Sequence, residues 1–304
     1  MSATTAASRE EQPGRGFGSE RLREALVGYV FIAAPLVLYA VLFFYPIAYS
    51  IYISRYDWGV LGKIDSVGWG NYRELLHDHR FGIAIKNGLK FTIAFTICSM
   101  ALGLFVAVVV NNAIRFRGFF RSAYYFPSIA SSAAITAVAL FILSADGLFN
   151  RITGLNNAWF GESGTALWAL VGLNSWTTSG TVMLFYLAYL QAIPTDVYEA
   201  AAIDGAGAWR TFSKITFPLL KPGHFFVSIL LITGGLKMFD QAFIASGGTG
   251  GPNNSTLVPV LYLYRVAFYD IRFGYAAAVG IALLLIMLGL TLIQRLTFGR
   301  RDAT

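Results

Sequence analysis

Long stretches without Asp, Glu, Lys or Arg constrain the fold of this chain more than any other feature. Five of them cover residues 25–54, 91–114, 122–145, 163–195 and 273–294. A helix needs about 20 apolar residues to cross the hydrocarbon core of a bilayer, so each stretch predicts a membrane-crossing helix. A sixth is predicted at residues 225–245, which have the length and hydropathy of a span but contain Lys237 and Asp240. We therefore expect an all-α integral membrane protein with six transmembrane helices.

The composition agrees with a membrane protein and excludes several other classes. Hydrophobic residues make up 56% of the chain and charged residues 13%, against roughly 45–50% and 25% in soluble domains. The single cysteine, Cys98, excludes a disulfide framework. The net charge of +7 comes from scattered Lys and Arg rather than a dense stripe, so no nucleic-acid partner is expected.

The predicted organisation is one membrane domain after a short tail. Residues 1–20 have no apolar run and are predicted to be a disordered cytoplasmic tail. They do not resemble a cleavable signal peptide, because the apolar run that follows is too long. The membrane domain covers residues 21–304, with spans expected at about 26–53, 89–112, 122–144, 166–190, 224–245 and 273–296.

The distribution of Lys and Arg between the loops predicts the orientation. The loops and tails on the side of the two termini carry 13 basic residues, and those on the opposite side carry nine. Because cytoplasmic loops are enriched in Lys and Arg, both termini are expected in the cytoplasm. The loop of residues 55–90 would then lie outside.

The cytoplasmic loop 193–222 has the pattern of two short helices joined by a glycine. Thr195 or Asp196 is expected to cap the first helix, and Gly205 to allow a sharp bend or a left-handed cap at its end. A helix over residues 208–215 would follow.

The second helix of this loop is predicted to have one apolar face. Trp209, Phe212 and Ile215 share that face at helical spacing, and Pro218 and Pro222 are expected to end the helix. Such a face could fit a groove on a partner protein, or it could lie on the membrane surface.

The spacing within this loop resembles the EAA loop of bacterial ABC importer permeases. Glu199-Ala200-Ala201 is followed by Gly205 after three residues, and Ile215 and Phe217-Pro218 complete the pattern. The chain is similar over most of its length to the carbohydrate-uptake permeases related to the maltose and glycerol-phosphate transporters. Further matching segments are Gly68–Tyr72, Arg117–Pro127, Asp146–Asn150, Leu190–Pro194, Phe239–Asp240, Gly247–Pro252 and Phe273–Val279.

This resemblance implies a type I ABC importer permease fold in a bacterial cytoplasmic membrane, forming half of a translocation pore for a sugar or related solute. The implied partners are a second, non-identical permease subunit, two cytoplasmic ATPase subunits and an external solute-binding protein. ATP and Mg would bind to the ATPases, since the chain lacks a GxxxxGK[ST] loop, and this chain is expected to hold no cofactor. The residues expected to couple the loop to the ATPases are Glu199, Ala200, Ala201, Asp204, Gly205, Ala206, Trp209, Phe212, Ile215 and Pro218.

Polar residues within the predicted spans mark a candidate substrate path. Lys237 and Asp240 stand three apart on one predicted helical face, so they could form an ion pair or contact solute. Hydroxyl and amide groups beside an aromatic plate are the chemistry of a neutral sugar site, although Ser and Thr can also bond their own helix backbone. The candidates are Ser128, Ser132, Asn174, Trp176, Thr177, Thr178, Thr181, Thr233, Lys237 and Asp240.

Two other functional classes fit the sequence less well than an ABC permease does. An ion-coupled secondary transporter using Lys237 and Asp240 is the alternative, but it leaves the EAA loop unexplained. An enzyme would need catalytic groups, and no HExxH or nucleophile-elbow motif is present. His77 and His79 with Asp78 could bind a metal weakly, but a metal site normally has three or four ligands and a solvated polar loop is favoured. Neither catalytic nor metal-binding residues are therefore expected.

Overall fold

The computed structural model describes residues 17–112 and 116–298 and divides into two units, residues 1–52 and 53–304. In the first unit, α1 (Phe17–Tyr39) continues through a π-helical turn, η1 (Ala40–Phe44), into α2 (Tyr45–Ile53). The apolar helix Arg23–Ile53 is 31 residues long, enough to cross a membrane. Helix α1 starts within the segment predicted to be a tail; the rest of that segment, residues 1–16, lies outside the described residues.

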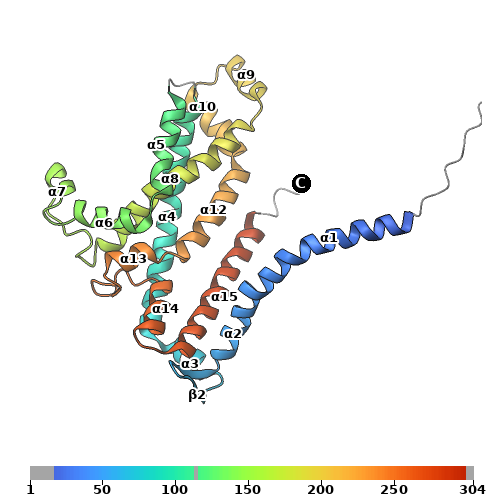
Figure 1. Cartoon of the computed structure of the whole chain (residues 1–304). Helices are drawn as coiled ribbons and strands as arrows, with labels where there is room; N and C mark the ends of the chain where they lie inside the picture. The colour runs from blue at the N-terminus through green and yellow to red at the C-terminus, as the bar shows by residue number, and fades with distance from the viewer. Residues whose placement is uncertain (1–16, 113–115, 299–304) are drawn as a thin grey trace, which may run out of the picture. The chain divides into compact units, whose positions relative to one another are not determined.

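Helix α4 (His79–Asn111) is the centre of the second unit (Figure 1). It packs most extensively on α8 (Ala166–Gln191) and next on α12 (Lys221–Leu236). The helices approach closely because small residues lie at their contacts: a Cβ on Gly103 would overlap Val182 of α8, and one on Gly235 would lie 2.9 Å from Thr92 Oγ1. Such contacts replace the hydrophobic driving force that lipid does not supply between membrane helices.

The third predicted span, residues 122–144, is not one helix. It consists of α5 (Arg117–Ile129) and α6 (Ser132–Ile142), which are bent by 94° relative to each other. Pro127, near the end of α5, removes a backbone donor and so favours a break there.

The fifth predicted span, residues 224–245, is interrupted as well. Helix α12 ends at Leu236, and a short helix, α13 (Asp240–Ala245), follows after three non-helical residues. Non-helical backbone at membrane depth is tolerated where it is buried in protein or lines a cavity.

The remaining elements complete the two ends of the second unit. In Figure 1, α3 and the start of α15 lie at one end, and α9 lies at the other. Among the described residues, the strands β1 and β2 form one small antiparallel hairpin, and the other regular elements are helices. The elements are β1 (Tyr56–Gly59), β2 (Gly62–Ser66), α3 (Gly70–His77), α7 (Leu148–Thr153), α9 (Thr195–Ile203), α14 (Pro259–Phe268) and α15 (Phe273–Phe298).

Length and hydropathy identify fewer membrane-crossing helices than the six predicted. Among the described residues, four helices pass this test, or five if α5 and α6 count as one span. Helix α8 matches the predicted span 166–190 and carries no charge, but Asn, Ser and Thr near its middle lower its mean hydropathy. The sixth span, 273–296, corresponds to α15.

Helix α4 begins ten residues before the span predicted at 89, because Asp78 caps it. An Asp78 carboxylate oxygen accepts hydrogen bonds from the backbone N–H groups of Arg80, at 2.8 Å, and Phe81, at 3.2 Å. The side chain thereby satisfies two donors that have no partner within the helix.

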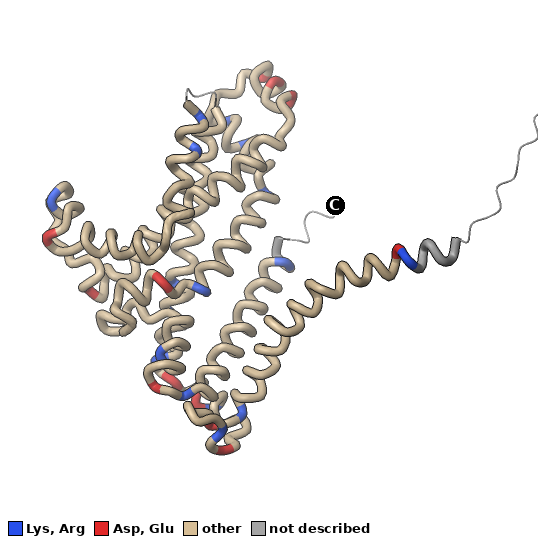
Figure 2. The backbone as a smooth tube through the Cα atoms, viewed as in Figure 1, with Lys and Arg blue, Asp and Glu red and all other residues tan. Residues whose placement is uncertain are grey.

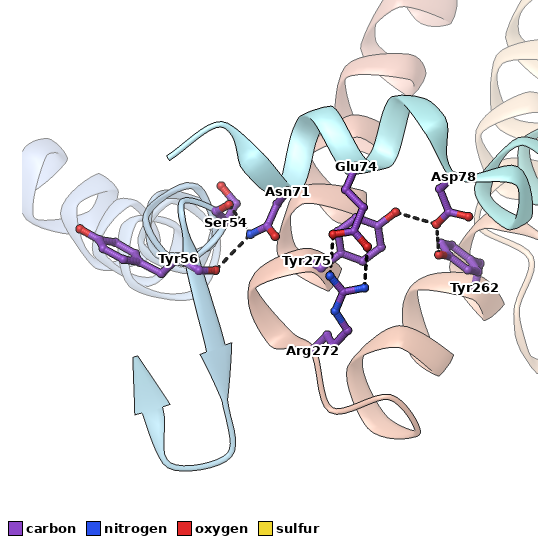
Figure 3. A network of polar contacts seen from close by, with 8 residues as sticks. All are labelled: Ser54, Tyr56, Asn71, Glu74, Asp78, Tyr262, Arg272 and Tyr275. Atoms are coloured by element: carbon purple, nitrogen blue, oxygen red, sulfur yellow. Dashed lines mark hydrogen bonds and ion pairs between the residues drawn. The ribbon is translucent and has the colours of Figure 1, made fainter. Parts of the chain in front are cut away.

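The other carboxylate oxygen of Asp78 joins three helices (Figure 3). The hydroxyl of Tyr275 on α15 donates to it at 2.6 Å, and the hydroxyl of Tyr262 on α14 donates to the same atom. Burial raises the pKa of Asp78, but these hydroxyls and the two backbone donors outweigh it and leave the pKa below the ordinary value of 3.8. Nearby, Arg272 and Glu74 form a two-bond ion pair at 2.6 and 2.7 Å.

We expect Asp78→Asn to destabilise the protein, because the amide keeps the cap oxygen but replaces the acceptor of Tyr262 and Tyr275. A buried hydroxyl left unsatisfied costs about 1–3 kcal/mol. Since the folded-state pKa is lowered, the carboxylate stabilises the fold at pH values above the unfolded-state pKa, and this stabilisation is lost as the pH falls through the folded-state pKa. Thermal unfolding is measured in detergent from neutral to acid pH. The unfolding temperature of the variant should be lower than that of the wild type at neutral pH, and the difference should disappear in acid.

Asp65→Asn is the matched control, because Asp65 is exposed on β2. If both variants lowered the unfolding temperature equally, or if the effect of Asp78→Asn did not depend on pH, the role given to Asp78 would be contradicted.

Candidate functional site: a pocket between broken helices and a helical loop

A pocket with both polar and apolar lining residues lies where α12 breaks. It has a volume of about 380 Å³ and lies between α4, α8 and the α12–α13 junction. A smaller hollow of about 200 Å³, beside the break between α5 and α6, shares Thr178, Thr181 and Gln241 with it. The two interrupted spans therefore open onto one polar region.

Eight of the ten predicted substrate-path residues line these two spaces. Lys237, Asp240, Asn174, Thr178 and Thr181 line the larger one. Ser128, Ser132 and Thr177 line the smaller one, together with Thr178 and Thr181. In all, the lining residues from the predicted set are Ser128, Ser132, Asn174, Thr177, Thr178, Thr181, Lys237 and Asp240, and the two that lie elsewhere are Trp176 and Thr233.

The predicted ion pair between Lys237 and Asp240 is not formed. In the part of the chain that the structure describes, the Lys237 ammonium makes no ion pair, and Asp240 accepts a hydrogen bond from Ser132 Oγ at 3.0 Å. Of the two alternatives, the ion pair failed because it placed both residues on one continuous helix, whereas Lys237 is the C-terminal cap of α12 and Asp240 the first residue of α13.

Each of these charges lies instead at a helix end of opposite polarity. A helix C-terminus carries partial negative charge and an N-terminus partial positive charge. Lys237 lies at the C-terminus of α12, and Asp240 lies at the N-terminus of α13 and is bonded to Ser132, the first residue of α6. Figure 2 shows that most other charges gather at the ends of the second unit or near α7.

Several of the hydroxyl and amide groups bond to the backbone. Ser128 Oγ donates to the carbonyl of Thr177 at 2.5 Å and accepts from the N–H of Thr181 at 3.2 Å, which joins α5 to α8. Asn174 Nδ2 donates to Leu170 O at 2.9 Å, and Thr177 Oγ1 donates to Asn174 O at 3.0 Å. The polar side chains of these residues thus bond to backbone groups, as the alternative to solute contact predicted.

Two predicted residues lie outside the pocket. Trp176 is half exposed and lines an apolar groove with residues of α6, so it supplies no aromatic plate to the polar region. Thr233, within α12, lines neither space.

Sequence reasoning missed the aromatic residues and the amide that complete the pocket. Phe91 and Phe95 stack at 5.4 Å on α4, and Phe239 lies in the break. Gln241, which lines both spaces, follows Asp240 directly. A polar pair, Asp240-Gln241, within an apolar run was the available signal for it.

The adjacent glycines before the break have different surroundings. A Cβ on Gly235 would press against Thr92 of α4, so this glycine serves close packing. A Cβ on Gly234 would meet nothing within 4 Å, and this glycine lines the pocket.

The loop 193–222 contains the predicted pair of helices. Helix α9 ends in a left-handed Gly205, with φ of +68°. The N–H of Gly205 donates to Ala202 O at 3.1 Å and that of Ala206 to Ala201 O at 2.9 Å, which is the Schellman arrangement. The predicted conformation of Gly205 is confirmed.

The start of α9 differs from the prediction. Pro194 is the capping residue and makes no side-chain cap bond, so Thr195 and Asp196 lie in the first turn. Glu199, Ala200 and Asp204 are exposed, whereas Ala201 is buried.

The second helix of the loop is longer and less regular than predicted. It comprises α10 (Ala208–Thr211), a π-helical turn η2 (Phe212–Thr216) and α11 (Phe217–Leu219). Pro218 and Pro222 do not end it; each lies in the first turn of a helix, where the missing N–H is not needed. Trp209 is 77% exposed within this chain, and Phe212 and Ile215 are half-buried.

Three comparisons with known proteins agree with this architecture. Residues 99–301, more than half of the chain, match the family model "Binding-protein-dependent transport system inner membrane component". The multiple sugar-binding transport system permease protein MsmF of Streptococcus mutans is 32% identical over 279 residues, which cover 90% of this chain and 95% of MsmF. The lactose transport system permease protein LacF of Rhizobium radiobacter is 33% identical over 276 residues, covering 88% and 92%.

A solved structure has the same fold. A chain of the bacterial alginate ABC transporter, crystallised with an alginate pentasaccharide-bound periplasmic protein, aligns with a TM-score of 0.83. The alignment covers 94% of this chain and 98% of that one at 18% identity, so the likeness concerns the fold. The family match and the relatives above 30% identity establish that this chain belongs to the binding-protein-dependent transport system inner membrane components, the permease subunits of ABC importers.

Proposed function

We propose that this chain forms half of the translocation pore of an ATP-driven importer for a neutral sugar or oligosaccharide. The observation that carries the proposal is the pocket at the α12–α13 break, where polar groups meet aromatic rings at membrane depth. A second, non-identical permease subunit would supply the other half of the pore. An external binding protein would deliver the solute.

The chemistry of the pocket supports a neutral, hydroxyl-rich solute. Lys237 and Asp240 together contribute no net charge, and Asn174, Thr178 and Gln241 add hydrogen-bonding groups. Phe91, Phe95 and Phe239 offer apolar faces of the kind that sugar rings contact. Relatives that are named as permeases for multiple sugars, lactose and arabinooligosaccharides support the same class of solute.

Helix α9 is suited to transmit the motion of ATPase subunits. It ends in hydrogen-bonded Schellman geometry at Gly205, and it exposes Glu199, Ala200 and Ile203. On this proposal α9 lies in the cytoplasm, as do both termini of the chain, and ATP with Mg binds on the ATPase subunits. The ion-coupled alternative has no support from a Lys237–Asp240 contact, since none is formed among the described residues.

Affinity purification of the tagged protein in mild detergent, with mass spectrometry and an ATPase assay, tests the proposed assembly. We expect an ATP-hydrolysing subunit and a second permease to be recovered with this chain. Recovery of the chain alone, with solute transport in liposomes that does not need ATP, would contradict the proposal.

We expect Gly205→Val to impair ATP-driven uptake. Its Cβ would meet no neighbour, so the effect comes only from the left-handed backbone, which costs an L-residue about 1–2 kcal/mol. A cost of this size shifts an equilibrium about 5–30-fold. Uptake by reconstituted vesicles should fall while membrane insertion stays normal.

Gly207→Ala is the control for that variant, since Gly207 has φ of −69° and open space around it. Uptake at the wild-type rate by Gly205→Val would show that the end of α9 does not couple ATP hydrolysis to solute uptake.

We expect Lys237→Ala to raise the solute concentration for half-maximal uptake, because Lys237 lines the pocket. Thr233→Ala, in the preceding turn but outside the pocket, should leave that concentration unchanged. Uptake assays across solute concentrations measure both. A larger effect of Thr233→Ala than of Lys237→Ala would place the path elsewhere.

A further inference from the structure

The loop that contains α9 and α10 is divided by charge. Residues 195–206 carry three acids, Asp196, Glu199 and Asp204, and no Lys or Arg. Residues 207–222 carry Arg210, Lys214 and Lys221, and no Asp or Glu. An anionic membrane surface attracts basic segments and repels acidic ones. The basic half, residues 207–222, is therefore the one that an anionic membrane surface would attract, and the acidic half, residues 195–206, would be repelled by it.

An apolar groove of about 460 Å³ lies between this basic half and α4. Trp209 and Phe212 form its wall on one side, with ring centroids 5.9 Å apart. Phe105, which is 67% exposed, and Leu104 lie on the α4 side. The complete lining is Ala101, Leu104, Phe105, Val108, Ala208, Trp209 and Phe212, and it contains no polar side chain apart from the indole N–H of Trp209.

The α4 side of the groove belongs to a helix that is long and apolar enough to cross a membrane. Its α4 residues belong to the apolar span His79–Asn111 and lie three to ten residues from the end of that helix. At 1.5 Å per residue this corresponds to about 5–15 Å from the helix end. The exposed Arg210 and Lys214 belong to the same short helical segment, next to Trp209 and Phe212.

We propose that this groove, which we name the α4–α10 groove, binds an acyl chain of an anionic phospholipid from the cytoplasmic leaflet, with its headgroup beside Arg210 and Lys214. The proposal rests on the cytoplasmic placement of the loop under the proposed function. It assigns Trp209 and Phe212 to the membrane and leaves α9 as the half that faces the ATPases. An amphipathic helix binds such a surface through buried apolar area together with basic residues.

Quenching of tryptophan fluorescence by brominated lipid tests this assignment. The assembled transporter is reconstituted in vesicles of phosphatidylethanolamine and phosphatidylglycerol, with bromine on the acyl chains of one lipid or the other. Subtracting the emission of a Trp209→Phe transporter isolates Trp209 from the other five tryptophans of this chain. We expect that difference to be quenched about twofold more when phosphatidylglycerol carries the bromine.

A groove-filling variant gives a second readout. Ala101→Phe adds a ring inside the α4–α10 groove and should reduce the quenching of Trp209, whereas Leu102→Phe adds bulk on α4 outside the groove and should not. Equal quenching by both brominated lipids would overturn the proposal, because it would indicate ordinary contact with the bilayer. Absence of quenching would also overturn it, since protein would then cover the groove.

These outcomes are separable from a failure of the proposed function. If ATPase subunits co-purify and ATP drives uptake while Trp209 shows no preference for brominated phosphatidylglycerol, only the lipid assignment fails. If no ATPase co-purifies, the proposed function fails whatever the fluorescence shows.

Discussion

The need to satisfy every backbone N–H and C=O within a membrane governs this structure. A continuous helix satisfies these groups with its own hydrogen bonds. Where a helix is interrupted, the backbone groups that lose their partners must be satisfied by neighbouring groups. The two breaks in the second unit, between α5 and α6 and between α12 and α13, occur beside the same polar region. The hydrogen bond between Ser132 and Asp240 joins them. Both interrupted helices therefore place their broken ends beside the same polar region, which is the candidate solute site.

Single asparagine amides organise the loops outside the spans. Asn71 Nδ2 donates to the carbonyls of Ser54 and Tyr56, at 2.8 and 3.0 Å, and holds α3 against the start of β1 (Figure 3). Asn87 on α4 donates to Asn254 O and Leu257 O and holds the glycine-rich segment before α14. Asn150 donates to three carbonyls and accepts from Trp159 Nε1. Two of the short matching segments, 68–72 and 146–150, therefore contain residues that fasten loops.

Local features of the fold could be predicted from the sequence, and features that depend on tertiary contacts could not. The apolar runs identify the helices, and the left-handed Gly205 follows from its position after an alanine-rich helix. The span 224–245 was drawn as one helix because hydropathy averages over a window and does not register where a helix is interrupted. The ion-pair alternative for Lys237 and Asp240 was wrong for the same reason. The pocket needed α4, whose Phe91 and Phe95 look like ordinary apolar residues of a span.

The length of α4 has a mechanical consequence. Its 33 residues rise by about 50 Å, whereas the hydrocarbon core is about 30 Å thick. Along this one rod lie, in order, the Asp78 cap bonded to two tyrosines, the phenylalanines of the pocket, and the wall of the α4–α10 groove. A continuous helix changes its length very little, so a tilt of α4 at one end would be carried to the other. A tilt imposed near the loop would displace the wall of the pocket and the hydrogen bonds between Asp78 and the two tyrosines in a single movement.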